Sequence, residues 1–192
     1  MTTRKDIWNF KLTNAALFVI AAGIGVNYIG NFLTSVFHIP LWMDSIGTIL
    51  SAFLLGPVGG LTVGFFSNYA YGFIDHISYL YTTTSMVIGI TAGIFSRTTY
   101  FQHWYRTILL IFMLVILCDA VSTPLNVIAM AGNSGITLWD DIFSYLQYHG
   151  IGLFMASFLA EAAGEFADKT LMVVISILCY RNLPKSILKH FQ

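Results

Sequence analysis

Three acidic residues in the last quarter of the chain share one face of a predicted helix. Glu161, Glu165 and Asp168 occupy positions i, i+4 and i+7, and Lys169 follows Glu165 by four residues. Asp119 adds a fourth acid inside another apolar run. Ionisable groups are costly in such surroundings, so they must be protonated, hydrated or matched by donors. The excess of acid over base favours a cationic or donor-rich ligand, and proton relay or metal binding by these acids stays open.

Other polar and aromatic residues lie in or beside the apolar segments. If these segments cross a membrane, many of these residues fall in the half expected to face outward. Convergent polar groups on an apolar, aromatic-rich wall are typical of a small-molecule pocket. We therefore predict a substrate pocket that opens outward. The predicted substrate-binding residues are Asn27, Asn31, Trp42, Asp44, Asn68, Tyr71, Thr84, Asp119, Asn126, Tyr148, Glu161, Glu165 and Asp168.

A purely structural interpretation competes at several of these positions. Glu165 and Lys169 could form a packing salt bridge, and Asn27 and Asn31 could join helices by hydrogen bonds. Tyr148 lies in a segment with aromatic residues that could equally anchor the chain at the membrane interface.

The sequence holds no motif for catalysis, and no enzyme activity, cofactor or metal site is predicted. It contains no G-x-x-x-x-G-K-[ST] run, so it lacks a P-loop for nucleotide hydrolysis. H-E-x-x-H, C-x-x-C and G-x-S-x-G are also absent, and the five histidines are scattered.

Composition places these residues in a membrane protein. Hydrophobic residues make up 57% of the 192 positions and charged residues only 9%, whereas soluble domains carry about 25% charged residues. A bilayer core of ~30 Å needs about 20 apolar residues in a helix. We expect one membrane domain, 1–192, organised as an all-α bundle of six transmembrane helices. The predicted spans are 12–37, 42–56, 58–74, 79–100, 106–131 and 151–180.

The basic residues predict the orientation of this bundle. Eight of the nine lie in the N-terminal segment, the loop between the fourth and fifth spans, or the C-terminal segment; Lys169 is the exception. The connections around 38–42, 75–78 and 132–149 contain no Lys or Arg. The positive-inside rule therefore places both ends in the cytoplasm, with tails 1–10 and 181–192.

Local patterns predict three further features. Gly56-Pro57 predicts a tight helical hairpin between the second and third spans. The segment 138–149 is expected to form a short amphipathic helix on the outer face. Small residues at four-residue intervals, such as Gly56, Gly60 and Gly64, are expected mainly to pack helices inside the bundle.

The stretch from Ile39 to Asn68 (IPLWMDSIGTILSAFLLGPVGGLTVGFFSN) resembles the second and third helices of S components of energy-coupling factor (ECF) transporters. The length, six predicted spans and orientation are similar too. The resemblance implies a multi-pass protein of the bacterial cytoplasmic membrane that captures a vitamin or related micronutrient from outside. It also implies partners: a transmembrane coupling subunit and two cytoplasmic ATPases. Many members have an Ala-x-x-x-Ala docking motif on the first helix, where this chain has Ala21 and Gly25.

The substrate is open among several vitamins, and the acidic helix favours cobalamin or a pyridoxine/thiamin-type compound over a carboxylate-rich one such as folate. Two other functions compete with that of a binding subunit. The acids could instead serve a self-sufficient, ion-coupled secondary transporter of a small cationic or polar solute. The chain could also be a sensory or scaffolding membrane protein without a ligand.

Overall fold

The computed structural model describes residues 7–98 and 104–188, and within these ranges it is helical without any β-strand. This confirms the all-α prediction. The elements are α1 (Asn14–Phe37), α2 (Ile46–Leu55), α3 (Pro57–Tyr71), the 3₁₀ helix η1 (His76–Tyr79), α4 (Thr82–Thr98), α5 (Trp104–Met130), α6 (Thr137–Tyr148), α7 (Leu153–Asn182) and α8 (Lys185–Leu188).

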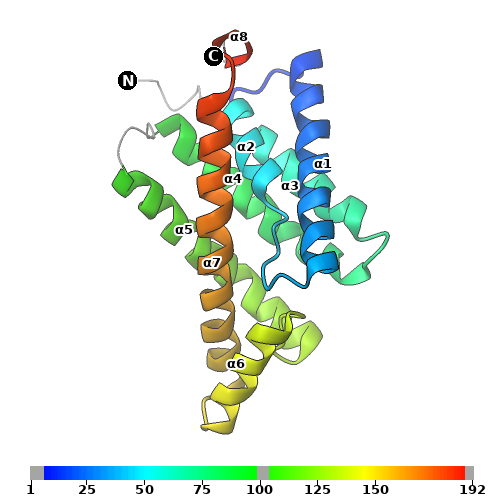
Figure 1. Cartoon of the computed structure of the whole chain (residues 1–192), viewed down its shortest axis with the longest axis vertical. Helices are drawn as coiled ribbons and strands as arrows, with labels where there is room; N and C mark the ends of the chain where they lie inside the picture. Colours follow the sequence, from blue (N-terminus) through cyan, green and yellow to red (C-terminus); the bar gives the residue numbers. More distant parts are fainter. Residues whose placement is uncertain (1–6, 99–103, 189–192) are drawn as a thin grey trace.

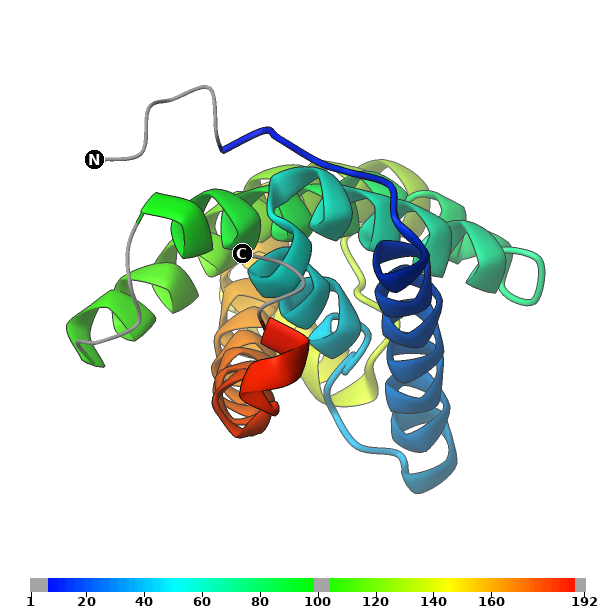
Figure 2. The same cartoon turned by 90° about the horizontal axis from the view of Figure 1, so that it is seen from above.

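The long helix α7 runs the length of the molecule and packs mainly against α2, α5 and α6 (Figure 1). Seen from above, α2 lies between α7 and α1 (Figure 2). The start of α1, the α2–α3 turn, the end of α4 and the end of α7 lie toward one end (Figure 1). A hydrogen bond from Arg97 Nη2 to the Leu54 carbonyl oxygen, 3.4 Å long, connects α4 to α2 there. The α1–α2 connection and α6 lie toward the opposite end.

Two of the described helices, α1 and α5, are long and apolar enough to cross a membrane by length and composition. Helix α7 is longer, but every stretch of it that could cross ~30 Å contains Glu165, Asp168 and Lys169. Helices α3 and α4, with 15 and 17 residues, are shorter than the ~20 residues that a simple span needs. Length and composition thus support a membrane location weakly and do not establish six spans.

The predicted second span, 42–56, is wrong at its start. Helix α2 begins at Ile46 and has ten residues, or ~15 Å at 1.5 Å per residue. Before it, residues 38–45 form a non-helical connection in which His38 and Met43 have positive φ angles of 52° and 50°. Pro40 also disfavours helix, because it lacks a backbone N–H. The predicted fourth span, 79–100, likewise begins too early, since α4 begins at Thr82 after η1; positions 99 and 100 lie outside the described residues.

The predicted hairpin at Gly56 is present. Helix α2 ends at Leu55 and α3 starts at Pro57, with Gly56 at a φ of 80° that favours glycine. The small residues of α3 face α4, and a Cβ added at Gly60 would lie only 2.6 Å from the Gly89 carbonyl oxygen. This part of the small-residue pattern is therefore internal packing, as predicted.

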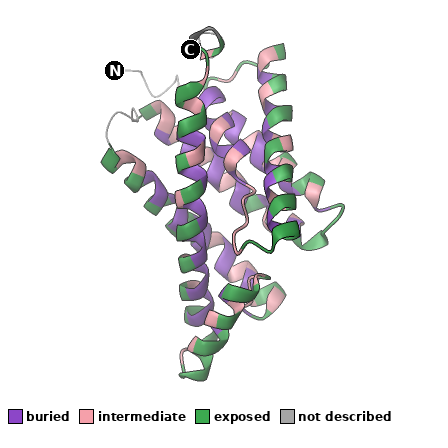
Figure 3. Cartoon of the chain, viewed as in Figure 1, coloured by how far each residue is buried: buried purple, intermediate pink, exposed green. Residues whose placement is uncertain are grey.

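Burial in this bundle is the reverse of that in a water-soluble domain (Figure 3). The side chains of Asp119, Asp168 and Lys169 are at most 2% exposed. Large apolar side chains on the same helices point outward, with Ile116 60% and Leu178 53% exposed. Charged residues of soluble proteins lie at the surface, where water solvates them. The outer surface of these helices is apolar instead.

The interior changes character along the bundle. Toward the end where α7 terminates, α2, α4, α5 and α7 enclose an apolar core. Its members include Ile49, Phe53, Ile88, Phe95, Leu110, Leu114, Met172 and Ile177. Toward the other end, polar residues replace apolar ones on the inner faces of α1, α3, α4, α5 and α7. The change occurs on several helices, so it leaves one polar region inside the bundle.

Candidate functional site

The polar region encloses a cavity of about 730 Å³. Its walls come from α1, α3, α4, α5 and α7. The three connections without Lys or Arg each contribute lining residues, from within 38–42, 75–78 and 134–138. A volume of ~300–1,000 Å³ is usual for sites that hold a drug-sized molecule.

Eight of the thirteen predicted substrate-binding residues line this cavity: Asn31, Trp42, Asp44, Asn68, Tyr71, Thr84, Glu161 and Glu165. They come from four helices (α1, α3, α4 and α7) and from the connection between α1 and α2, so their convergence is a property of the fold. The other five (Asn27, Asp119, Asn126, Tyr148 and Asp168) are not part of the lining.

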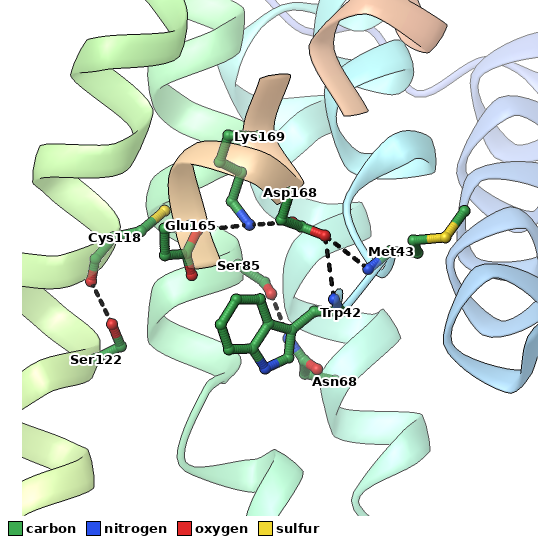
Figure 4. Close-up of polar contacts among 9 residues, drawn as sticks. All are labelled: Trp42, Met43, Asn68, Ser85, Cys118, Ser122, Glu165, Asp168 and Lys169. Atoms are coloured by element: carbon green, nitrogen blue, oxygen red, sulfur yellow. Dashed lines mark hydrogen bonds and ion pairs between the residues drawn. The ribbon is translucent and has the colours of Figure 1, made fainter. Parts of the chain in front are cut away.

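Lys169 lies in the wall of the cavity, between two carboxylates of its own helix (Figure 4). Its Nζ is 2.8 Å from Glu165 Oε2 and 2.7 Å from Asp168 Oδ2. All three side chains are buried. A buried ion pair survives the loss of hydration only when its geometry and further hydrogen bonds are good. The predicted Glu165–Lys169 pair is therefore present, with Asp168 as a second partner.

Asp168 connects this ion pair to the segment before α2. Its Oδ1 accepts hydrogen bonds from the backbone N–H groups of Trp42, at 3.1 Å, and Met43, at 2.9 Å (Figure 4). A buried backbone N–H without a partner is costly, and no helix supplies one in this connection. Asp168 thus satisfies the polar backbone of a non-helical segment and holds it against α7.

Glu161 and Asp44 also contribute carboxylates to the cavity. Unlike Asp168, neither of them forms a salt bridge with a described residue. Glu161 Oε2 accepts a hydrogen bond of 3.1 Å from Thr123 Oγ1. Asp44 makes no side-chain hydrogen bond or ion pair with another of the residues that the structure describes. Lys169 is the one lysine of the lining, and it is already bound by two other acids. The cavity wall consequently carries more acid than base.

The wall formed by α3 and α4 supplies neutral polar groups. Asn68 Nδ2 donates to Ser85 Oγ (Figure 4) and also to the Tyr81 carbonyl oxygen. The Tyr81 hydroxyl donates to Asn126 Oδ1, which joins this wall to α5. Thr84 lines the cavity and is 6% exposed, and its hydroxyl has no hydrogen-bond partner among the described residues.

Two tryptophans meet on α7 at Gly164, which lies between Glu161 and Glu165. A Cβ at Gly164 would approach the Trp139 indole to 2.9 Å and that of Trp42 to 3.0 Å. Trp139 Nε1 also donates to the Pro40 carbonyl oxygen at 3.0 Å, so α6 is fastened to the α1–α2 connection. The absence of a side chain at Gly164 lets both rings lie directly on the acidic helix.

The five predicted residues outside the lining have other positions. Asn27 donates to Thr48 and Ser67 and accepts from the Gly47 N–H at 2.7 Å, so it joins α1 to α2 and α3. Asp119 is buried, and neither of its oxygens has a hydrogen-bond partner within the part of the chain that the structure describes. Tyr148, at the end of α6, is 88% exposed. Asn126 and Asp168 support the lining through the bonds described above.

The proposed docking pair on α1 is accessible. Ala21 is exposed, and nothing lies within 4 Å of a Cβ added at Gly25. The assignment of this face to a partner stays a prediction.

Several lining residues were not in the predicted set, notably Tyr81, Ser122 and residues 134–138. Tyr81 directly precedes the polar start of α4, so its position beside Thr84 was an available signal. Ser122 lies one helical turn before Asn126 and pointed to the same face of α5. Residues 134–138 could not be found in this way, since they reach the cavity only through the packing of α6.

The arrangement is suited to noncovalent binding. It combines carboxylates, amides, hydroxyls and indole rings around a space of molecular size. Among the described residues, no group of three or more His, Cys, Asp or Glu side chains is placed to hold a metal ion.

No family model, curated protein or solved structure matches this chain.

Proposed function

We propose that this protein is a six-span protein of the bacterial cytoplasmic membrane that captures a small nutrient from outside. In this proposal it is the S component of an ECF-type importer, and not an enzyme. The observation that carries the proposal is the cavity, in which polar groups from five helices converge beneath three connections free of Lys and Arg.

The inverted burial supports a membrane environment. Ionised side chains lie inside and large apolar ones outside, as expected where lipid replaces water around the helices. In hydrocarbon the groups Glu165, Asp168 and Lys169 have to face the interior, and they do. The same groups account for the low apolarity of α7, so its composition does not argue against a span.

The short helix α2 fits the proposal when the segment before it is included. Helix α2 extends over ~15 Å, and the eight residues 38–45 can extend over up to ~26 Å at about 3.3 Å each. Non-helical backbone is tolerated at membrane depth only where protein buries it or where it lines a cavity. Residues 38–42 line the cavity, and Asp168 binds two N–H groups of this segment.

Charge supports the orientation. Arg97 of α4 binds Leu54 beside the α2–α3 turn, at the end of the molecule where α1 begins and α7 terminates (Figure 1). Arg181 lies in the last turn of α7 at that end. The cavity lies toward the other end, beneath the connections that hold no Lys or Arg. By the positive-inside rule, this distribution of charge favours a cavity that faces the outside.

Energy for uptake would come from partners. The sequence has no P-loop, and it resembles S components between Ile39 and Asn68. We propose that a transmembrane coupling subunit and two cytoplasmic ATPases complete the importer. The exposed face around Ala21 and Gly25 of α1 is the proposed docking surface for the coupling subunit.

The proposed substrate is a vitamin or related micronutrient. A cavity of about 730 Å³ is within the ~300–1,000 Å³ of drug-sized ligands, which favours a pyridoxine/thiamin-type compound over the far larger cobalamin.

Reconstituted uptake tests this function. The protein would be placed in proteoliposomes with and without a coupling subunit and ATPases, and uptake of radiolabelled vitamins would be measured. We expect uptake only when the partners and ATP are present. Uptake by the chain alone would contradict the S-component assignment.

One observation favours a second function, an ion-coupled transporter. Asp119 is 1% exposed, and both its carboxylate oxygens lack a partner, as in residues that bind and release a proton. Uptake by this chain alone that follows an imposed proton gradient and is lost in Asp119→Asn would establish that function.

A further inference from the structure

The ion pair of Lys169 determines which carboxylates remain for a ligand. Asp168 accepts from two backbone N–H groups and from Lys169, so both of its oxygens are occupied. Glu165 is bound to the same lysine at 2.8 Å. These two acids therefore neutralise Lys169 and support the fold. Although both lie in the acidic pattern of α7, they are not the free charges of the site.

Two other acids of the lining, Glu161 and Asp44, form no salt bridge with any residue that the structure describes. Glu161 is 3% exposed and accepts hydrogen bonds from neutral groups, among them the Thr123 hydroxyl. Asp44 bonds to no other described side chain. A carboxylate turned into a confined site needs a counter-charge or a set of donors, because burial removes much of its hydration.

Aromatic residues line the same cavity as these carboxylates. The Trp42 indole lies against Gly164, three residues after Glu161, and Trp42 precedes Asp44 by two residues. Tyr71 and Tyr81 also line the cavity. The faces of such rings attract cations and stack on planar ligands. Thr84 adds a buried hydroxyl that no described residue binds, as expected where a ligand supplies the missing hydrogen bond.

From this geometry we infer that the captured solute is an organic cation with a planar ring, and that Glu161 and Asp44 bind its positive charge. This inference rests on the proposed function and specifies the substrate class of that site. Trp42 packs on the ring of the ligand, whereas the Lys169 ion pair stays intact when the ligand binds.

Calorimetry on the purified full-length protein in lipid nanodiscs tests this assignment. The probes are thiamin, a permanent cation with planar rings, riboflavin as a planar neutral compound, and pantothenate as an anion. We expect thiamin to bind more tightly than either of the others. Glu161→Gln and Asp44→Asn should each weaken thiamin binding about 10- to 100-fold, as when one charged hydrogen bond is lost.

Asp141→Asn is the matched control. Asp141 is an exposed acid of α6 and does not line the cavity. Its effect on thiamin binding should be less than about threefold. Glu161→Asp retains the charge and should bind thiamin better than Glu161→Gln, which separates loss of charge from misfolding.

The outcomes separate this inference from the proposed function. Tighter binding of riboflavin or pantothenate than of thiamin, or equal thiamin binding by wild type, Glu161→Gln and Asp44→Asn, would overturn the cation assignment alone. Binding of none of the probes, with no small molecule carried through purification, would overturn the proposed capture function as well.

Discussion

Asp168 and Met43 are 125 positions apart in the chain, yet Asp168 Oδ1 accepts a hydrogen bond of 2.9 Å from the Met43 backbone N–H. The same carboxylate binds Lys169 through its other oxygen. One buried acid of α7 therefore fixes both the non-helical segment before α2 and the lysine beside the cavity.

This relationship predicts a large cost for Asp168→Ala. The substitution leaves two backbone N–H groups without an acceptor and removes one of the two partners of Lys169. We expect the free energy of unfolding to fall by about 3–5 kcal/mol. Unfolding in detergent, followed by circular dichroism, measures it. Asp168→Asn keeps an acceptor and should cost less, and a loss below about 1 kcal/mol in the alanine variant would contradict this role.

Lys169→Met should also destabilise the protein, because it leaves Glu165 and Asp168 as buried charges without a cation. The expected loss is about 3–5 kcal/mol. The double variant Glu165→Gln/Lys169→Met removes one of those charges as well and should recover part of the loss. A double-mutant cycle on unfolding free energies measures the coupling, and additive effects would show that the ion pair contributes nothing.

Gly164→Leu should abolish ligand binding while the protein stays folded. Even a Cβ at this position would lie 2.9–3.0 Å from the indole rings of Trp139 and Trp42, so a larger side chain has to displace them. Ala163→Leu is the control, because Ala163 is exposed on the same helix. Size-exclusion chromatography checks folding, and quenching of tryptophan fluorescence measures binding. Equal binding by both variants would contradict the position of the site.

Gly25→Leu tests the proposed docking face on α1. A Cβ at Gly25 meets nothing within 4 Å, so the variant should keep its stability and its ligand affinity. Association with the coupling subunit should weaken at least tenfold, as for a clash in a close helix contact. Co-purification from membranes measures this association, and Ala167→Leu on the exposed face of α7 serves as the control. Normal association of the Gly25 variant would place docking elsewhere.

Much of the fold followed from local patterns. Gly56-Pro57 forms the predicted hairpin, and the predicted amphipathic segment 138–149 is α6 with a shift of one residue. The small residues Gly60 and Gly89 pack α3 on α4. These features depend on backbone conformation and helical spacing, which neighbouring residues determine.

The sequence predicted which residues line the candidate site better than it predicted what each of them does there. Spacing placed Glu161, Glu165 and Asp168 on one helical face, but it could not reveal that Asp168 binds backbone N–H groups 125 positions away. Hydropathy extended the second span back to residue 42, because Trp42 and Met43 are as apolar as residues of a membrane helix although they precede α2. Such long-range contacts arise only from packing, so sequence patterns do not contain them.

The most direct test of the central claim, that this cavity captures a small solute, is mass spectrometry of the gently purified protein. The wild-type protein and Gly164→Leu would be purified in parallel, and the small molecules released on denaturation would be identified and quantified. We predict one organic compound at near-stoichiometric amount in the wild type and its absence from Gly164→Leu. No such compound in either protein, or equal amounts in both, would contradict the account.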